Sequence, residues 1–572
     1  MIPSGYEDGT LGSLKPTDGT GDFTFTRGSN ISATRVNADG NIEKGYENLL
    51  FPSNDFSGWS KVELDLTPNQ ADPFGGNTAS LITTTGTTFG WIRRIPTTTG
   101  VQTISFYAKA GSNTIFTASV IQAPYPQIKF TLTGNGSTSS NSVPIDSTIT
   151  SVGDGWYRCS MTFNVTSTYE IRFYPNDTIN ETIGDSAYIY GFQLNQGLVA
   201  YPYVETTTAP VAGGILEDMP RLDYSNGSCP SLLLEPSRTN SVDKSEYGFI
   251  TNNTSIEYNN AISPEGYQNA FKSTATGTSA VFTRLADISG GVTNPLVSVF
   301  VKYGNNPWLN IIYSGNANTY FNFNCQTGEF GTSVGSLTSN LKAENYGNGW
   351  WRVSARFNYS GAGNLRVYMA SSGTTGFATG STTIGNYFYG YGFQLEQDAT
   401  YPTSYIPTYG VSQTRLADVC VNAGDVNTFN NNEGILYAEV EPLTNGSDVG
   451  VLSLRGTGGV QTGLLTLKFN YASNSLQYFI YNASVLEFNR SVSFNLNQKI
   501  KVAAKYSIGE CALYINGVKQ YGITGFTEFA PNTLQDVSFN TFSAEYLKAN
   551  VNQVLYFPTA LSDEACIELT TI

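Results

Sequence analysis

The chain has 572 residues, a formal net charge of −15, only 13% charged residues and no histidine. The absence of histidine excludes Ser-His-Asp and Cys-His catalysis and any His-ligated metal site. The acidic balance, without a run of Lys or Arg, argues against nucleic acid and against an anionic membrane surface as partners.

Composition predicts an all-β protein. Aromatic and β-branched residues lie on a polar, glycine-punctuated background, which favours strands joined by tight turns. No apolar stretch approaches the ~20 residues of a membrane span, and the first residues lack the basic and apolar regions of a secretory signal. We therefore expect synthesis in the cytoplasm and no membrane insertion. No CxxC spacing occurs, so reduced thiols are predicted for the six cysteines at positions 159, 229, 325, 420, 511 and 566.

Residues 1–45 form a leader with two strand-like runs, at 23–26 and 33–36. Asp39-Gly40 is a tight-turn signal that predicts a small hairpin, with residues 34–37 folded back on 41–43. The same segment has a superficial likeness to a calcium loop. It lacks the bidentate glutamate that such a loop needs, so the hairpin is the preferred interpretation.

Two long segments of the chain repeat each other. Residues 153–158 read GDGWYR and residues 347–352 read GNGWWR, while YGFQL occurs at 190–194 and again at 391–395. The spacing is far too long for a short solenoid repeat and predicts a duplicated domain. We place the copies at 46–205 and 241–420, joined by a proline-rich linker at 206–240.

The last strand of each copy shows a period of two. In the first copy Tyr188, Tyr190, Phe192 and Leu194 are predicted to share one face, and the second copy keeps the pattern. One bulky face is what a sandwich strand needs to fill the space between two sheets. Each copy is therefore predicted to be an antiparallel β-sandwich.

Residues 421–572 follow a different pattern and are predicted to form a third sandwich. Strand-like runs recur at regular spacing, and Asn516-Gly517 lies between two of them as a strong hairpin signal. Near the end, Ser562 precedes Asp563 and Glu564, which predicts a short helix with a serine cap and an acidic first turn.

Several of these motifs resemble those of tailed-bacteriophage virion appendage proteins, the head and tail fibres. The leader carries the resemblance at 23–27, 33–37 and 40–43, and the linker carries it at 220–224 and 229–240. The two copies resemble carbohydrate-binding-module-type jelly rolls through 155–158, 392–396 and 402–408. Residues 501–520 and 561–564 are similar to laminin-G/concanavalin-A-like lectin domains.

The resemblance implies a structural virion appendage that presents lectin-like domains to host-surface glycans during adsorption. Its partners would be other virion proteins and those glycans, its location the virion, its leader a virion-attachment segment, and its oligomeric state a homotrimer. No cofactor is implied. Jelly rolls often hold a structural calcium ion through backbone carbonyls and one or two aspartates, and Asp185 and Asp223 are the candidate ligands here.

Two groups of side chains stand out as site candidates. Trp156 and Arg158 recur as Trp350 and Arg352, and a position kept in both copies points to the framework: tryptophans packed between the sheets and arginines bonded at the sandwich edge. Aromatic residues in predicted loops outside that framework are the candidates for stacking on sugar rings. These are Trp59, Trp91, Tyr125 and Trp308.

Two other functions stay open. The chain could be a purely architectural capsid or tail decoration protein that binds no glycan. It could also be a capsule-degrading glycosidase, which needs two carboxylates roughly 5–9.5 Å apart. Glu439 and Glu441 alternate on one predicted strand at about 7 Å, but Pro442 follows and no third acid is present. A solvent-facing strand is the preferred interpretation, and no enzymatic activity is predicted.

Overall fold

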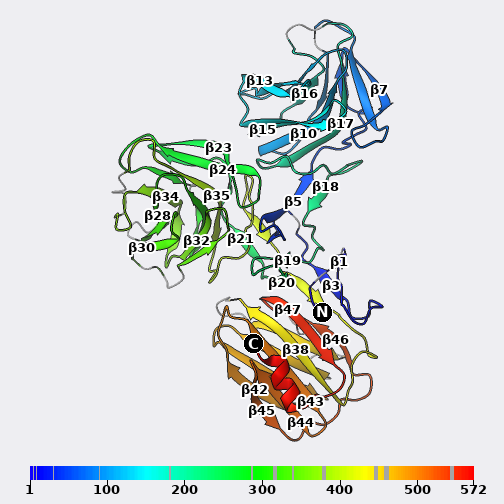
Figure 1. Ribbon diagram of the computed structural model, residues 1–572, viewed down its shortest axis with the longest axis vertical. Coiled ribbons are helices and arrows are strands. Elements are labelled where there is room, and N and C mark those ends of the chain that lie inside the picture. The colour runs from blue at the N-terminus through cyan, green and yellow to red at the C-terminus, as the bar shows by residue number, and fades with distance from the viewer. Residues whose placement is uncertain are drawn as a thin grey trace.

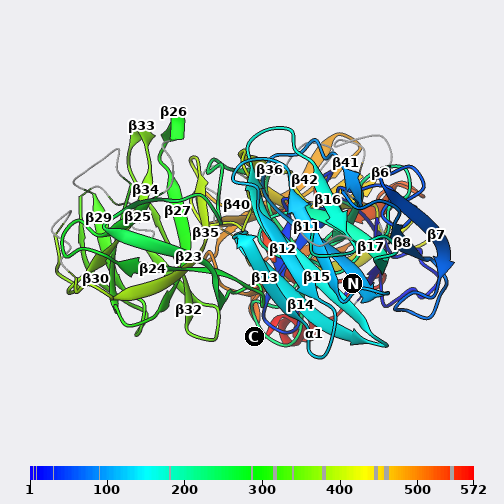
Figure 2. The ribbon, with the colours of Figure 1, turned by 90° about the horizontal axis from the view of Figure 1, so that it is seen from above.

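The protein consists of three antiparallel β-sandwiches around a central junction (Figure 1). The junction is made of short strands from the leader (within residues 6–48), the linker (within 211–240) and the segment 413–421. Seen from above, the second sandwich lies to one side of the other two (Figure 2). The predicted all-β fold is confirmed. The structure is a computed structural model, and it describes the chain apart from residues 4, 8, 30, 89, 179–181, 285–287, 314–318, 336, 338–340, 377–381, 444–448, 457–462 and 541–545.

The first sandwich packs two six-stranded sheets on a shared apolar core. One sheet has, in spatial order, β14 (Asp146–Gly153), β15 (Trp156–Val165), β10 (Gly100–Ala110), β17 (Ser186–Gln196), β8 (Ala79–Thr84) and β7 (Leu64–Gln70). The other has β13 (Ser137–Ser142), β12 (Gln127–Thr131), β11 (Ile115–Val120), β16 (Ile171–Tyr174), β9 (Trp91–Arg94) and β6 (Ser60–Val62).

The second sandwich repeats this topology strand for strand. Its first sheet has β31 (Lys342–Asn345), β32 (Trp350–Arg356), β27 (Leu296–Tyr303), β35 (Tyr387–Glu396), β24 (Gln268–Ala275) and β23 (Thr254–Ile262). Its second sheet has β30 (Glu329–Val334), β29 (Tyr320–Asn324), β28 (Trp308–Tyr313), β34 (Leu365–Ala370), β25 (Phe282–Arg284) and β22 (Ile250–Asn252). A small extra pair is formed by β26 (Ile288–Thr293) and β33 (Ser360–Gly363).

A β-bulge interrupts the strict alternation predicted for β17. Its glycine, Gly191, has φ +60°, and beyond it Phe192 and Leu194 face the core. Tyr190, and with it Tyr188, belongs to a separate cluster on the outer face of the same sheet. The prediction that these four side chains share one face is therefore wrong, because an extra residue in one strand reverses the order of faces after it.

The leader is folded into the junction. β1 (Tyr6–Glu7), β2 (Thr10–Leu11) and β3 (Phe23–Thr26) form a sheet with β37 (Val419–Val421), which follows the second sandwich. The predicted hairpin is present as β4 (Thr34–Val36) paired with β5 (Ile42–Asn48). β5 also pairs with β18 (Val211–Gly214) from the linker.

The linker contributes strands to other sheets as well. β21 (Arg238–Asn240) pairs with β36 (Gln413–Arg415), so the two ends of the second copy are joined. β19 (Leu222–Asp223) and β20 (Ser231–Leu234) extend a sheet of the C-terminal sandwich. The segment between the copies is thus an integral part of the fold (Figure 1).

The C-terminal sandwich packs a seven-stranded sheet on a five-stranded one. The larger sheet continues from β19 and β20 into β47 (Ala549–Phe557), β38 (Glu433–Pro442), β43 (Ile500–Ser507), β44 (Glu510–Ile515) and β45 (Val518–Ile523). The smaller sheet has β42 (Val485–Ser493), β41 (Ser475–Asn482), β40 (Gly463–Asn470), β39 (Val449–Gly456) and β46 (Leu534–Ser538).

Two local predictions for this sandwich are present in the structure. Asn516 and Gly517 join β44 to β45 with φ values of +49° and +79°, as a two-residue hairpin turn requires. The helix α1 (Asp563–Thr570) begins after Ser562, whose side chain accepts a hydrogen bond from the backbone N–H of Ala565 at 3.2 Å. It is the one helix in the described part of the chain.

Candidate functional site

Trp156 and Trp350 are buried, with 2% and 1% exposure, but neither lies between the sheets. On β15 the neighbouring Tyr157 faces the core, so Trp156 projects from the opposite face. Each tryptophan belongs to an aromatic cluster on the outer face of its sheet. The first cluster adds Tyr107 and Tyr190, and the second adds Phe300, Tyr391 and Tyr405. The prediction that Trp156 and Trp350 pack between the sheets is therefore wrong.

Arg158 and Arg352 hold a following segment of the chain against this outer face. In the first copy it is the segment after β17, and in the second copy it is the segment after β35. Arg352 donates to the carbonyl oxygen of Thr403 at 2.7 Å and to the hydroxyl of Ser298 at 3.1 Å. Arg158 donates to the carbonyl oxygen of Tyr201 in the same way. The structure therefore places both arginines in the framework, with bonds to the backbone.

A buried ionic network joins the leader, the linker and the end of the second sandwich; we call it the arginine hub. The Nη1 atoms of Arg221 and Arg415 lie 2.8 and 3.0 Å from the same oxygen of Glu235. Arg221 also pairs with Asp418, as does Arg27 at 3.4 Å. All five side chains are at most 3% exposed.

Glu235 is the acceptor that organises the hub. Ser404 donates to it from the backbone N–H at 2.8 Å and from the hydroxyl at 2.7 Å. Burial alone would raise the pKa of Glu235, but Arg415 and Arg221, with the Ser404 hydrogen bonds, outweigh burial and lower the pKa to about 2. Glu235 is therefore a carboxylate throughout the physiological range, and it lies beside a large cavity.

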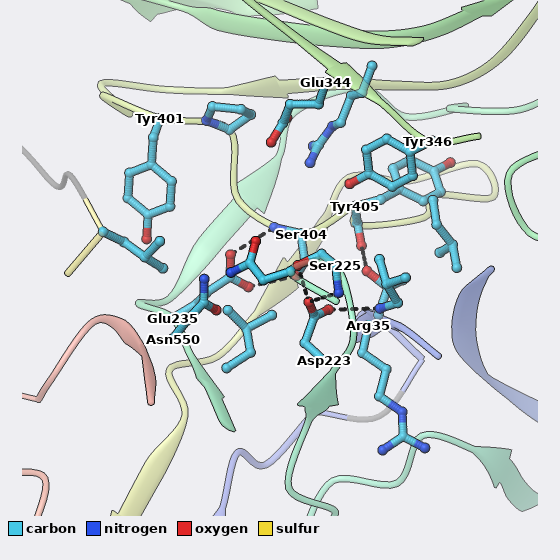
Figure 3. Close-up of a pocket in the computed structure, with 18 of the residues that line it drawn as sticks. Arg35, Asp223, Ser225, Glu235, Glu344, Tyr346, Tyr401, Ser404, Tyr405 and Asn550 are labelled. Carbon is cyan, nitrogen blue, oxygen red and sulfur yellow. Dashed lines mark hydrogen bonds between the residues drawn. The ribbon is translucent and has the colours of Figure 1, made fainter. Parts of the chain in front are cut away.

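The cavity has a volume of about 890 Å³ and lies where the junction meets the second and C-terminal sandwiches (Figure 3). Four separate parts of the chain line it. The leader hairpin supplies Arg35, Asp39 and Asn41; the linker supplies Asp223, Ser225 and Glu235; the second sandwich supplies Glu344, Tyr346, Tyr401, Ser404 and Tyr405; and the C-terminal sandwich supplies Glu441, Tyr471 and Asn550. The size falls in the range of small-molecule sites.

Among the described residues, the wall of the cavity contains buried polar atoms without a hydrogen-bond partner. Besides the Nε atom of Arg352, they include the hydroxyl oxygen of Tyr401 and the side-chain oxygen of Asn550, a residue only 7% exposed. Unpaired buried polar atoms are rare because each loses its bonds to water. These atoms have almost no accessible surface, so they can bond to a polyhydroxylated ligand beside the tyrosine rings only after a small movement of the wall exposes them.

Sequence reasoning missed these wall residues. Tyr401 directly precedes residues 402–408, which the sequence singles out as the end of the second copy, but its role depends on Asn550 far along the chain. Asn550 reaches this place on β47, which pairs with β20 on one side, opposite Leu233, and with β38 on the other, opposite Glu441. No local pattern predicts that contact.

Of the aromatic residues predicted as sugar contacts, two are buried. Trp59 is 3% exposed and packs edge-to-face against Phe56 and Phe192 in the first core. Trp91 is 7% exposed and begins β9, with the guanidinium groups of Arg93 and Arg172 over its ring at 5.1 and 4.7 Å. Trp59 does lie in the predicted loop, just before β6, whereas Trp91 is in a strand, and neither is accessible to a sugar, because flanking glycines mark a turn without deciding burial.

Tyr125 and Trp308 are more accessible. Tyr125 is 57% exposed, in a loop where its φ is +60°. Trp308 is half-buried at the start of β28, and Gly373 leaves room for its ring: a Cβ there would lie 2.6 Å from it. They belong to different sandwiches, and none of the four predicted residues lines the cavity.

The aspartates predicted as calcium ligands bond to backbone groups. Asp223 accepts from the N–H of Val36 at 2.8 Å and from the N–H of Ser225 at 3.0 Å, which fixes the linker turn against the leader hairpin. Asp185 accepts from the N–H of Thr182 at 3.1 Å. Among the described residues, no group of three or more His, Cys, Asp or Glu could hold a metal ion. The cysteines are free thiols, of which Cys229 alone is exposed.

The two glutamates considered for glycosidase chemistry have separate partners. Glu439 forms an ion pair with Lys499 at 2.9 Å. Glu441 accepts a hydrogen bond from Asn226 at 3.0 Å and lines the cavity. In the part of the chain that the structure describes, no helix is long and apolar enough to cross a membrane.

No protein-family model matches the chain, and no curated protein matches it. Solved structures give weak likenesses. The CBM40 module of a Ruminococcus gnavus IT-sialidase, bound to α2,3-sialyllactose, is 14% identical over 25% of this chain and 84% of its own, with a TM-score of 0.22. Domain 4 of a GH43 extracellular arabinanase from Geobacillus stearothermophilus, in complex with arabinotriose, is 12% identical over 27% and 73%, with a TM-score of 0.22.

Mouse laminin α1 domains LG4–5 are 8% identical over 47% of this chain and 86% of their own, with a TM-score of 0.18. At these TM-scores the likenesses carry no argument about what the chain binds. The sandwich architecture stands on the sheets themselves.

Proposed function

We propose that the chain is a glycan-binding structural appendage protein of a tailed-bacteriophage particle, and that the junction cavity is its saccharide site. The observation that carries the binding proposal is the cavity of about 890 Å³ with the unpartnered Tyr401 hydroxyl and Asn550 side-chain oxygen in its wall. The chain makes no bond-breaking contribution in this proposal, because both candidate glutamates of β38 already have partners.

The chemistry of the wall suits a sugar. The ring of Tyr346 or Tyr401 can stack on the C–H face of a pyranose, while the buried oxygen of Asn550 accepts from a hydroxyl group. The cavity is lined by five carboxylates (Asp39, Asp223, Glu235, Glu344 and Glu441) and three cationic side chains (Arg35, Lys342 and Arg352). The acidic excess favours a neutral saccharide over an anionic one.

The virion assignment rests on the sequence resemblance of the leader and linker to phage appendage proteins. A homotrimer on a particle that carries many copies would raise the avidity of weak sites without any new contact. Electron microscopy of the particle with an antibody against the chain tests the location. Labelling of fibres or capsid supports the assignment, and particles without label contradict it.

A glycan array probed with the full chain tests the binding. We expect neutral host-surface glycans to be retained, and Tyr401→Phe to weaken that retention about tenfold, as expected for the loss of one hydrogen bond of about 1.4 kcal/mol. Tyr125→Phe is the matched control and should leave binding unchanged. Equal effects of the two substitutions would remove the cavity as the site, and a loss confined to Trp308→Ala would move it to β28.

The architectural alternative has its own support in the arginine hub, which ties three parts of the chain together without any ligand. An array without any retained glycan, obtained with protein whose melting is intact, would favour this alternative over glycan binding.

A further inference from the structure

Lys44 is the centre of a second buried polar cluster, which shares Tyr405 with the wall of the cavity. It lies on β5, its side chain is 0% exposed, and its Nζ atom is 2.5 Å from an oxygen of Glu246 and 2.9 Å from Oε2 of Glu265. Both glutamates belong to the second sandwich and are at most 4% exposed. One lysine thus faces two carboxylates away from water.

Asn269 lies beside Lys44 in this cluster. Its Nδ2 atom donates to Oε2 of Glu265 at 2.7 Å, so the amide and the Lys44 ammonium meet at the same oxygen. Asn269 is 1% exposed, and its Oδ1 atom has no hydrogen-bond partner. A purely structural role for Asn269 in the turn would need only the hydrogen bond that Nδ2 donates. It would not explain why the Oδ1 atom is buried without a partner.

Aromatic rings enclose the group. The Lys44 Nζ atom lies 5.2, 5.6 and 6.0 Å from the ring centres of Tyr391, Tyr405 and Tyr409. A lysine, a carboxamide and a bridging carboxylate are therefore held together in a dry, low-dielectric setting. These are an amine nucleophile, an acyl group and an acid–base catalyst at high effective concentration.

We propose that Lys44 and Asn269 join in an intramolecular isopeptide bond, with the Glu265 carboxylate as the acid–base group. Glu265 takes one proton from the Lys44 ammonium, and the neutral amine then forms a bond from Nζ to Cγ of Asn269. The C–Nδ2 bond breaks as the protonated Glu265 gives its proton to Nδ2, and Glu265 then takes the second proton from Nζ. The leaving ammonia carries that proton away as ammonium, so Glu265 is a carboxylate again. The step needs no oxidant, cofactor or metal.

The charges determine how fast the bond forms. Burial lowers the pKa of Lys44, but Glu246 and Glu265 outweigh burial and raise it, so the charged lysine predominates. The reactive neutral amine is therefore the minor form of Lys44. A slow reaction suffices, because each molecule reacts once. The product fastens the leader strand β5 covalently to the second sandwich.

Mass spectrometry of the denatured full chain tests the bond. The expected mass is below the sequence mass by one ammonia, about 17 Da, and protease digestion should release a branched peptide that contains Lys44 and Asn269. A mass equal to the sequence mass overturns the proposal. So does a deficit without the branched peptide, since a succinimide at Asn516-Gly517 also loses ammonia.

Variants distinguish the isopeptide bond from other causes of the mass deficit. In Lys44→Arg and Asn269→Ala the deficit should vanish, and in Glu265→Gln it should vanish or form far more slowly during incubation. Asn77→Ala is the control, because Asn77 is an exposed asparagine on the corresponding turn of the first copy, where Thr78 takes the place of Asn269; it should keep the deficit. Persistence of the deficit in Lys44→Arg contradicts the assignment. If a variant fails to fold, the mass of the wild-type chain still shows whether the isopeptide bond is present. That measurement does not depend on glycan binding.

Discussion

Arg221 is the side chain on which the arginine hub depends most, because it pairs with both Glu235 and Asp418. Replacement by alanine leaves two buried carboxylates with one arginine each. We expect Arg221→Ala to destabilise the junction by about 3–5 kcal/mol, the usual effect of breaking a buried pair. Hydrogen exchange of the β5 and β19 amides measures this local stability.

An exposed ion pair provides the control for Arg221→Ala. Lys342 lies 2.8 Å from Glu344, but its side chain is 56% exposed. We expect Lys342→Ala to change stability by less than about 1 kcal/mol. Similar losses for the two variants would mean that the hub contributes no more than a surface contact.

Glu235 gives the junction a defined response to acid. Its pKa falls from the ordinary 4.5 to about 2 on folding, so its contribution to stability is complete above pH 4.5 and is lost as the pH falls toward 2. The difference in stability between wild type and Glu235→Gln should thus be constant above pH 5 and shrink between pH 4.5 and 2. Urea unfolding at a series of pH values measures it, and a constant difference down to pH 2 would contradict the assignment.

In the last strand of each jelly roll, the bulge glycine controls which side chains reach the core. Gly392 has φ +59°, and a Cβ there would lie 3.1 Å from the Phe300 ring and 3.2 Å from the Tyr405 ring. Gly392→Ala should therefore destabilise the second sandwich by about 1–2 kcal/mol from φ alone, with a further loss from crowding. Thermal unfolding monitored by circular dichroism measures the effect.

Gly385→Ala separates the two contributions. Gly385 also has a positive φ, +88°, but no atom lies within 4 Å of the added Cβ. It should therefore show the conformational loss without the crowding. If Gly385→Ala is as destabilising as Gly392→Ala, contact with the two rings has no measurable effect.

Elements with local signals could be predicted from the sequence. The Asn516-Gly517 hairpin and the Ser562 cap depend on residues that are neighbours in the chain, and the repeated motifs gave the duplication. The bulge at Gly191 could not be predicted, because an unbroken alternation fits the same letters. The burial of Trp59 and Trp91 could not be predicted either, because contacts with distant strands decide it.

Across the whole molecule, the parts that sequence reasoning missed are the pairings between distant segments. β3 pairs with β37, β5 with β18, and β20 with β47. The junction and its cavity exist only through these pairings, so the leader, linker and C-terminal sandwich form one structure. A domain boundary at residue 421 therefore cuts through one sheet, because β19 and β20 (residues 222–234) belong to the same sheet as five strands of the C-terminal sandwich.

The C-terminal sandwich should consequently be incomplete on its own. Leu232 and Leu234 of β20 are 0% and 1% exposed in its core, and β20 covers the edge of β47. A fragment of residues 421–572 loses both side chains, each worth about 1.5–3 kcal/mol of apolar burial, together with Leu11, Phe23, Phe25 and Leu222 of the same core, and it exposes a strand edge. We expect this fragment to aggregate and to melt well below the same sandwich in the full chain.

A synthetic peptide of residues 219–236 should restore the fragment in part, because it adds the missing β19 and β20 but not the leader residues of the same core. The melting temperature measured by circular dichroism should rise with peptide concentration, because ligands that bind only the folded state stabilise it. A peptide with serine at positions 232 and 234 is the matched control and should have little effect, since it pairs the edge without filling the core. A fragment that melts as high as the same sandwich in the full chain, with neither peptide changing its melting temperature, would show that the sandwich folds without the linker, and the junction would then be an accessory to an independent C-terminal domain.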